Sequence, residues 1–176
     1  MTDLEHVMKY WNTYQSRRFL GSAIPMSETT EKQWLERATT AQPWEQGSMV
    51  LVIEDKKSGE FLGTTSLFDI SKPFRRAEFG VAIHNPEKHG KGYGTDATNV
   101  TLWIAFHVLG LRSVYLYVMA QNKRAIRSYE KAGFKHAGVF RKAMFSDGEY
   151  HDLAAMDILC EEFLEECPPG QLIAES

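Results

Sequence analysis

Apolar residues recur along the chain with two different periods, and each period indicates a type of element. In residues 3–15 they follow the 3.6-residue spacing of one helix face. Compact apolar runs, such as 49–53 and 114–118, are instead typical of strands. The pattern predicts helices over 3–15, 29–41, 95–109 and 123–132, and strands over 49–53, 61–68, 77–84, 114–118, 134–145 and 150–159. In the third helix, the stripe expected to face the core is Ala97, Val100, Ile104 and Val108.

Polar residues and glycines mark the breaks between these elements. Ser27 or Thr29 can cap the second helix, Gly110 ends the third, and Ser146-Asp147-Gly148 predicts a hairpin turn. No repeat or linker interrupts the order, so we expect one mixed α/β domain over 1–160, with a parallel strand–helix–strand unit at 77–118. An acidic tail follows over 161–176, and its first glutamates are expected to form a solvated helix face.

Length and charge narrow the classes of function. The 176 residues suit one domain, and 20 Lys and Arg against 23 Asp and Glu speak against a nucleic-acid partner. No apolar stretch is long enough to span a bilayer, and the N-terminus does not resemble a signal peptide. Cys160 and Cys167 lack metal-ligand spacing and are expected to be free thiols. We therefore predict a cytoplasmic protein with no metal and no membrane or nucleic-acid partner.

A glycine-rich segment between a predicted strand and helix carries the first candidate chemistry. Glycines alternate along 90–94, and the unpaired N–H groups of the following helix favour a phosphate. No P-loop motif is present, and Thr95 stands where a dinucleotide fingerprint would need glycine. On these residues alone, a plain structural turn remains the alternative. Positive charge beside the loop comes from Lys88, His89 and Lys91.

Three segments together resemble the GNAT superfamily of N-acetyltransferases, over about residues 3–160. They are Glu78-Phe-Gly-Val-Ala-Ile83, His89-Gly-Lys-Gly-Tyr-Gly94 and the stretch 122–134, which contains Asn122, Ala125, Ile126, Tyr129, Gly133 and Phe134. The family's loop reads Gln/Arg-x-x-Gly-x-Gly/Ala, so His89 in the first position is a departure. The chain is most similar to the branch of ribosomal-protein N-terminal acetyltransferases and spermidine/spermine acetyltransferases.

The resemblance implies a fold and a cofactor. The fold would be a mixed, mostly antiparallel twisted sheet with a splayed parallel central strand pair and flanking helices. The cofactor would be acetyl-CoA, with its pyrophosphate at the loop and its pantetheine arm paired with the strand. The residues so implied are Val81, Ala82, Ile83, His89, Gly90, Lys91, Gly92, Tyr93, Gly94, Thr95, Asn122, Ala125 and Ser128.

The resemblance also implies direct transfer to an amine, with Tyr129 as the acid that protonates the leaving thiolate. The alternative for Tyr129 is a packing role on the apolar helix side. Glu78 is the candidate base or amine-binding group, and its alternative is an ion pair with Arg75 or Arg76. Asp69 and His84 are lesser candidates, and neither cysteine has a nearby base in sequence.

The acceptor is less well specified. A polyamine such as spermidine, or a protein or peptide N-terminus, is expected, and a non-catalytic acetyl-CoA-binding regulatory domain is the alternative. We expect specificity from 15–30 and 145–150. Family members usually begin with a strand before the first helix, so here it is either absent or upstream, and a homodimer could supply an edge strand. Three acidic residues, Glu28, Glu31 and Glu36, could attract a polyamine. The interpretation that we favour for them is a solvated helix face.

Overall fold

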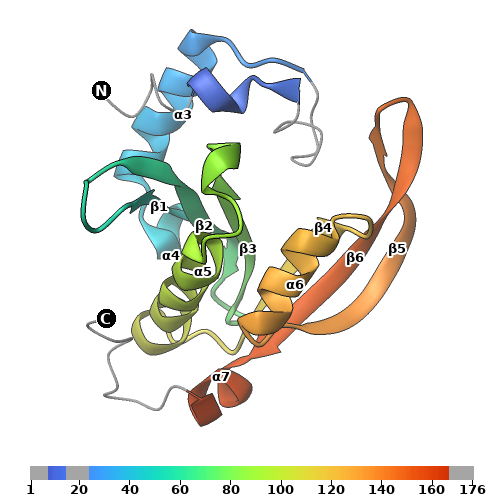
Figure 1. The fold of residues 1–176 in the computed structure, drawn as a ribbon. Coiled ribbons are helices and arrows are strands. Elements are labelled where there is room, and N and C mark those ends of the chain that lie inside the picture. Colours follow the sequence, from blue (N-terminus) through green and yellow to red (C-terminus); the bar gives the residue numbers. More distant parts are fainter. Residues whose placement is uncertain (1–7, 15–23, 167–176) are drawn as a thin grey trace.

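A six-stranded sheet forms the centre of the computed structural model, which describes residues 8–14 and 24–166 (Figure 1). Its strand order is β1-β2-β3-β4-β6-β5, and every neighbouring pair is antiparallel except β3 and β4. The predicted strands are all present. Their bounds are Met49–Glu54 (β1), Phe61–Ser71 (β2), Arg76–Ile83 (β3), Ser113–Met119 (β4), Lys135–Ser146 (β5) and Glu149–Leu159 (β6).

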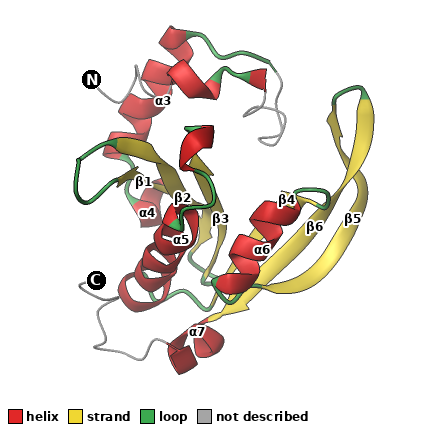
Figure 2. Cartoon of the chain, in the orientation of Figure 1, coloured by secondary structure: helices red, strands yellow, loops and turns green. Residues whose placement is uncertain are grey.

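Helices flank this sheet (Figure 2). Of the predicted helix over 3–15, residues 8–11 are helical, while 1–7 and 15–23 lie outside the described residues. The side chain of Ser27 caps the second helix as predicted, by accepting from the Thr30 N–H at 3.1 Å. The helices are α3 (Glu28–Thr40), α4 (Pro43–Gln46), α5 (Tyr93–Trp103) with its π-helical continuation η2 (Ile104–Val108), α6 (Lys123–Lys131), α7 (Cys160–Glu166) and the short 3-10 turn η1 (Pro86–Lys88).

The parallel pairing of β3 and β4 stops after three residue pairs. Arg76, Ala77 and Glu78 pair with β4, the last of them with Tyr115. Beyond this point β3 stays paired with β2 and β4 stays paired with β6, so the two halves of the sheet diverge. The predicted fold class, a mixed sheet with a splayed central pair, is thus confirmed.

Helix α5 packs on the sheet through a stripe that the sequence indicates only in part, since Ala97 is buried as predicted. Val100 and Val108 are 40% and 62% exposed, so the prediction that they face the core is wrong. Thr98 and Thr101 are fully buried in their place. Each threonine hydroxyl donates to the carbonyl four residues earlier, at 2.6 and 2.8 Å, and a satisfied hydroxyl can be buried at little cost.

The predicted hairpin at 146–148 is confirmed. Asp147 and Gly148 both have positive φ, 56° and 80°, as the turn types that suit a twisted hairpin require. The hairpin extends beyond the rest of the sheet (Figure 1), and its tip meets the N-terminal segment, where the Tyr14 hydroxyl donates to Asp147. Of the two regions expected to set specificity, the hairpin at 145–150 thus contacts Tyr14, which directly precedes the other region, 15–30.

Helix α7 shows how the acidic C-terminal segment joins the domain. Phe163 is 7% exposed and its ring lies 5.3 Å from that of Phe106. Glu161 is exposed and pairs with Arg112, as expected for a solvated face. The boundary at residue 160 stays a prediction, and 167–176 lie outside the described residues. No helix in the described ranges has the length and apolar character needed to cross a bilayer.

Gly133, which ends α6, offers a test of the local packing. Its φ is +93°, and a Cβ there would lie 3.0 Å from the Cδ1 of Ile158. Gly133→Ala should therefore lower the free energy of unfolding by about 2 kcal/mol, through backbone strain and crowding together. The control is Gly110→Ala, at φ +59° with nothing within 4 Å, where strain alone should cost about 1 kcal/mol. Equal losses in urea unfolding would contradict the crowding.

Candidate active site

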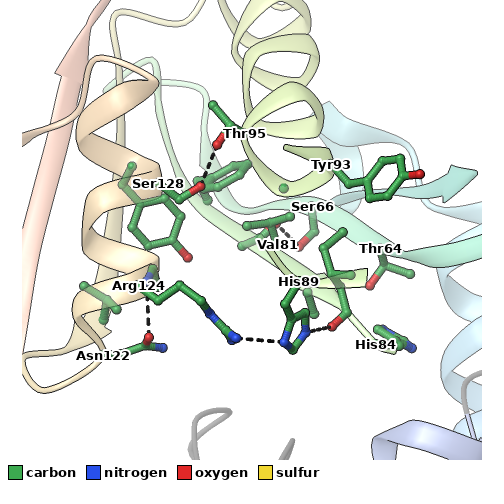
Figure 3. A pocket seen from close by; sticks show the side chains of 18 of the residues that line it. Thr64, Ser66, Val81, His84, His89, Tyr93, Thr95, Asn122, Arg124 and Ser128 are labelled. Atoms are coloured by element: carbon green, nitrogen blue, oxygen red, sulfur yellow. Dashed lines mark hydrogen bonds between the residues drawn. The ribbon is translucent and has the colours of Figure 1, made fainter. Parts of the chain in front are cut away.

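A cleft of about 1190 Å³ lies where β3 and β4 diverge (Figure 3). Val81 of β3 lines it and packs against the core that α5 and α6 cover. Its neighbour Ala82 also lines it, although successive side chains of a strand point to opposite faces. The cleft therefore opens on both faces of the sheet, so that two molecules can approach one point from opposite sides.

The glycine loop forms one end of this cleft and leads into α5. Gly90 and Gly92 have φ values of 74° and 92°, in the region that glycine adopts without strain. Gly92 is the N-cap of α5, so no side chain caps the first-turn N–H groups. Gly94 and Thr95 in that turn line the cleft. Uncapped N–H groups at the positive end of a helix dipole favour an anion there.

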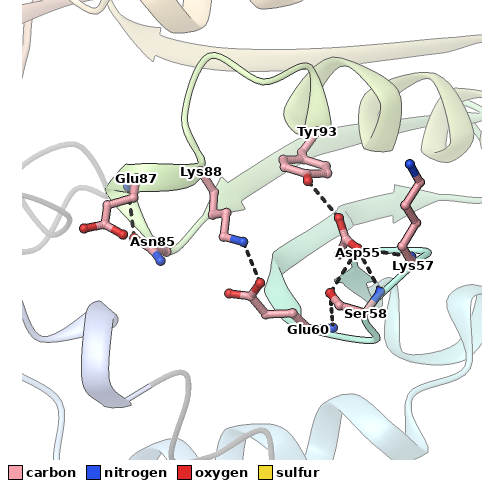
Figure 4. Close-up of polar contacts among 8 residues, drawn as sticks. All are labelled: Asp55, Lys57, Ser58, Glu60, Asn85, Glu87, Lys88 and Tyr93. Carbon is pink, nitrogen blue, oxygen red and sulfur yellow. Dashed lines mark hydrogen bonds and ion pairs between the residues drawn. The ribbon is translucent and has the colours of Figure 1, made fainter.

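The turn between β1 and β2 fixes this loop in place (Figure 4). The Tyr93 hydroxyl donates to Asp55 at 2.8 Å, and the Lys88 ammonium pairs with Glu60 at 2.5 Å. The Tyr93 hydroxyl and the N–H groups that Asp55 also accepts hold the pKa of its carboxyl well below the usual range. The ion pair with Glu60 means that the charge of Lys88 already has a partner. Lys91 is exposed and does not line the cleft.

His89 connects the loop to the two sides of the cleft. Its Nε2 lies 2.8 Å from the carbonyl oxygen of Ile83 at the end of β3. Its Nδ1 lies 2.8 Å from the Nη1 of Arg124 in the first turn of α6. Figure 3 shows these two contacts in line across the mouth of the cleft. Arg124 was not among the sequence-predicted site residues, although a basic residue in the first turn of this helix was a signal for it.

Three predicted residues of α6 or its N-cap line the opposite wall of the cleft: Asn122, Ala125 and Ser128. The Asn122 Oδ1 accepts from the Ala125 N–H at 3.2 Å and so caps the helix, while its amide N–H groups remain donors. The Ser128 and Thr95 hydroxyls bond to each other at 2.8 Å, which ties α6 to α5. The structure thus brings these residues together beside the glycine loop.

The backbone of β3 presents polar groups to the gap. The His84 N–H donates to Leu62 of β2 at 2.9 Å. Because backbone groups alternate in direction along an antiparallel strand, Ala82 also turns its N–H and C=O towards β2. Val81 and Ile83 turn theirs towards the gap, and the Ile83 carbonyl is taken by His89. Val81 is therefore the residue with both backbone groups available there, and Ala82 lines the cleft with its side chain.

Tyr129 lines the cleft from α6, and its ring packs edge-on against Phe79 and near Phe134. Burial raises the pKa of its phenol to about 12. The phenol is therefore protonated throughout the physiological pH range and can donate a proton into the cleft. The packing contacts hold the ring in one position, so the packing role is observed and does not exclude the acid role, which stays a prediction.

Glu78 lies on the opposite face of β3 and also lines the cleft. The pKa of the Glu78 carboxyl is raised mainly by burial and secondly by the negative charge of Asp69. The raised pKa makes this carboxylate a stronger base. The alternative of an ion pair is not supported in the described part of the chain. Arg75 instead lies over the ring of Trp44, and Arg76 lies over Tyr115.

The face of the cleft on the Glu78 side is aromatic and acidic. Glu31 of α3 lines it and is only 2% exposed, so the expectation of a solvated face is wrong for this residue and confirmed for Glu28 and Glu36. The helix periodicity could not signal this, because the burial comes from other elements. The aromatic side chains that line this part are Tyr10, Trp11, Trp34 and Phe68.

Two other predictions concern thiols and metals. Cys160 is a free thiol outside the cleft, and burial raises its pKa, which disfavours a nucleophile, while Cys167 is outside the described residues. No group of three or more His, Cys, Asp or Glu that could hold a metal ion occurs within 8–14 and 24–166. The absence of a metal stays a prediction.

His84 lies in the cleft wall and is 5% exposed, with its ring between those of Trp11 and Phe61. Within the described residues neither of its ring nitrogens has a hydrogen-bond partner, and burial lowers its pKa to about 4. A proton on this ring would therefore be placed in apolar surroundings.

This burial predicts an acid-sensitive fold. Between about pH 6.5 and 4 the unfolded chain binds a proton at His84 and the folded chain does not, so the free energy of unfolding should fall by about 3 kcal/mol as the pH is lowered through this range. Urea unfolding at several pH values should show a smaller fall in His84→Phe. The control His136→Gln, at an exposed histidine, should keep it. The same slope in all three proteins would refute the assignment.

The match to a family model for the acetyltransferase (GNAT) domain covers residues 1–135. Spermidine N(1)-acetyltransferase of Escherichia coli K12 is 37% identical over 116 residues, which is 65% of this chain and 62% of that enzyme. The Vibrio cholerae spermidine N(1)-acetyltransferase is 34% identical over 113 residues, 64% of each chain. The chain thus aligns with less than two thirds of the length of these relatives.

A solved structure is also similar to this chain. The crystal structure of a V. cholerae spermidine N-acetyltransferase in complex with CoA and spermine has a TM-score of 0.83, 26% identity and 93% coverage of both chains. The splayed sheet, the glycine loop and these matches agree with the resemblance seen in the sequence motifs. The chain belongs to the acetyltransferase (GNAT) domain family.

Proposed function

We propose that this protein transfers an acetyl group from acetyl-CoA directly to a primary amine, with a polyamine such as spermidine as the acceptor. The observation that carries the proposal is the cleft open on both faces of the sheet. An anion-binding helix start lies at one end, and two carboxylates, Glu31 and Glu78, lie on the other side. This arrangement suits an anionic cofactor and a cationic acceptor that meet at one point.

Acetyl-CoA would bind with its pyrophosphate on the N–H groups of residues 90–95, whose glycines allow close approach. Its pantetheine amides would pair with the N–H and C=O of Val81 and the N–H of Ile83, as an added strand would. The amide of Asn122 and the hydroxyl of Ser128 would hold the arm from α6. When bound, acetyl-CoA supplies an activated acetyl thioester.

The roles of the catalytic residues follow from their environments. Glu78, whose pKa is raised, accepts the proton that the amine must lose before its nitrogen can attack. A carbon–nitrogen bond forms as the carbon–sulfur bond breaks. Tyr129, part-buried and protonated, donates its proton to the departing sulfur and is then reprotonated from solvent.

A polyamine is favoured over a peptide N-terminus for two reasons. The Glu31 carboxyl is almost fully buried in the same cleft as Glu78, and two acidic groups along an aromatic wall suit a ligand with several ammonium groups. The similar enzymes of E. coli and V. cholerae are spermidine acetyltransferases, and the solved structure contains spermine. A peptide N-terminus carries one such charge.

A regulatory domain that binds acetyl-CoA without catalysis is the second candidate. It would need the loop, but not a protonated phenol on one side of the gap and, on the other, a carboxylate with no ion-pair partner among the described residues, so the enzyme is preferred. We further propose a cytoplasmic location and a homodimer, with no metal and no nucleic-acid partner. The net charge of -3 supports the last point.

The first test is thiol release from acetyl-CoA with a panel of amines. Spermidine and spermine should support turnover, and short peptides with Ala, Ser or Met N-termini should give less than about a tenth of it, because they lack the second ammonium group. Turnover with peptides alone would reassign the acceptor. Binding of acetyl-CoA by calorimetry with no turnover on any amine would favour the regulatory domain.

The second test concerns Tyr129. Tyr129→Phe removes the proton donor but keeps the ring, so kcat should fall by about 10²- to 10⁴-fold while the Kd for acetyl-CoA changes little. The control Tyr115→Phe removes a phenol hydroxyl outside the cleft and should leave kcat unchanged. An unchanged kcat in Tyr129→Phe would leave this residue with a packing role only.

A further inference from the structure

His89 departs from the residues that the family places at the start of the glycine loop, and its side chain has two specific contacts. One ring nitrogen meets the carbonyl of Ile83, and the other meets the guanidinium of Arg124, each at 2.8 Å. Ile83 ends β3 and Arg124 lies in the first turn of α6, so the ring spans the mouth of the cleft between its two sides.

The chemistry of the partners fixes the state of the ring. A guanidinium can only donate, so the Nδ1 of His89 must be the acceptor and carries no proton. A carbonyl can only accept, so the Nε2 must carry the proton and donate it to Ile83. His89 is thus a neutral imidazole in one tautomer, and both of its nitrogens are used.

The Lys and Arg residues that line the cleft are Lys88, Arg124, Arg127 and Lys131. Lys88 is already paired with Glu60, and within the described residues no hydrogen bond ties Arg127 or Lys131 to the glycine loop. Arg124 is held by a residue of the loop itself, directly before the uncapped start of α5. Only one of its five N–H groups is needed for His89, so the remaining donors can bind an anion placed at the loop.

We propose that Arg124 binds the pyrophosphate of coenzyme A and that His89 is the positioning residue which holds its guanidinium beside the glycine loop. The inference rests on the proposed function in one respect, the binding of coenzyme A at this loop. Because the charge of Lys88 is compensated by Glu60, the positive charge beside the loop comes instead from Arg124 of α6. The guanidinium is ordered before the ligand arrives, so less conformational entropy is lost on binding.

Calorimetric titration of CoA and of 3′-dephospho-CoA tests this assignment. Arg124→Ala should raise the Kd for both ligands by roughly tenfold or more, the effect of one charge-assisted hydrogen-bonded contact. The control Lys123→Ala removes the same charge from the neighbouring position of α6, outside the cleft, and should change Kd by less than about twofold. In the activity assay, Arg124→Ala should raise the KM for acetyl-CoA and leave kcat unchanged.

Substitutions of His89 separate the positioning role from simple packing. Glutamine can accept with its oxygen and donate with its nitrogen, so His89→Gln should stay within about twofold of the original Kd. His89→Phe keeps a ring but neither hydrogen bond, and should weaken binding by about three- to tenfold. A Kd in His89→Gln as high as in His89→Phe would overturn the positioning role.

The remaining outcomes are distinct. If the unmodified protein fails to bind CoA, the proposed function itself fails. If it binds and Arg124→Ala matches Lys123→Ala, the contact between His89 and Arg124 is structural only and the inference is overturned. A loss confined to CoA, and absent with 3′-dephospho-CoA, would assign Arg124 to the 3′-phosphate instead and would equally overturn the pyrophosphate assignment.

Discussion

The end of hydrogen bonding between β3 and β4 is the constraint on which the site depends. Pairing stops after Glu78 and Tyr115, yet each strand remains paired on its other side. The gap therefore leaves backbone donors and acceptors of Val81 and Ile83 unpaired in the middle of a sheet, where such groups normally find partners. His89 satisfies one of them, and an extended amide chain can satisfy the rest. The defect in the sheet is thus a binding surface of fixed geometry.

The two faces of the gap carry opposite electrostatic character. The α5 start and Arg124 provide positive potential where the glycine loop opens. The acidic residues Glu31 and Glu78 line the other side. Glu78 belongs to β3, Arg124 is bonded to the glycine loop, and that loop is held by the β1–β2 turn. The separation of these groups is therefore built into the fold. A cofactor with phosphates and an acceptor with ammonium groups would be sorted to opposite sides, which suits direct transfer without a covalent enzyme intermediate.

Much of this arrangement could be predicted from local signals. The Ser27 cap, the hairpin turn at 146–148 and the strand runs each depend on residues close in sequence, and these predictions are confirmed. The errors concern tertiary contacts. Val100 was expected inside because apolar residues favour burial, but threonines bonded to their own helix fill the buried stripe. Glu31 was expected on a solvated helix face, and Lys88 was expected to add positive charge beside the loop, whereas distant segments bury the first and pair the second.

The cost of the candidate catalytic residues argues for catalysis rather than for cofactor binding alone. A carboxyl such as Glu78, part-buried with no arginine on it, opposes folding at neutral pH because its charge is desolvated and lies near Asp69. Arg75 and Arg76 lie three and two residues before it in sequence, and both side chains lie over aromatic rings instead. A domain that only bound acetyl-CoA would gain stability by pairing this charge. A carboxylate with no partner among the described residues and a raised pKa, across the gap from the protonated phenol of Tyr129, suits the proton transfers that we propose for acetylation of an amine.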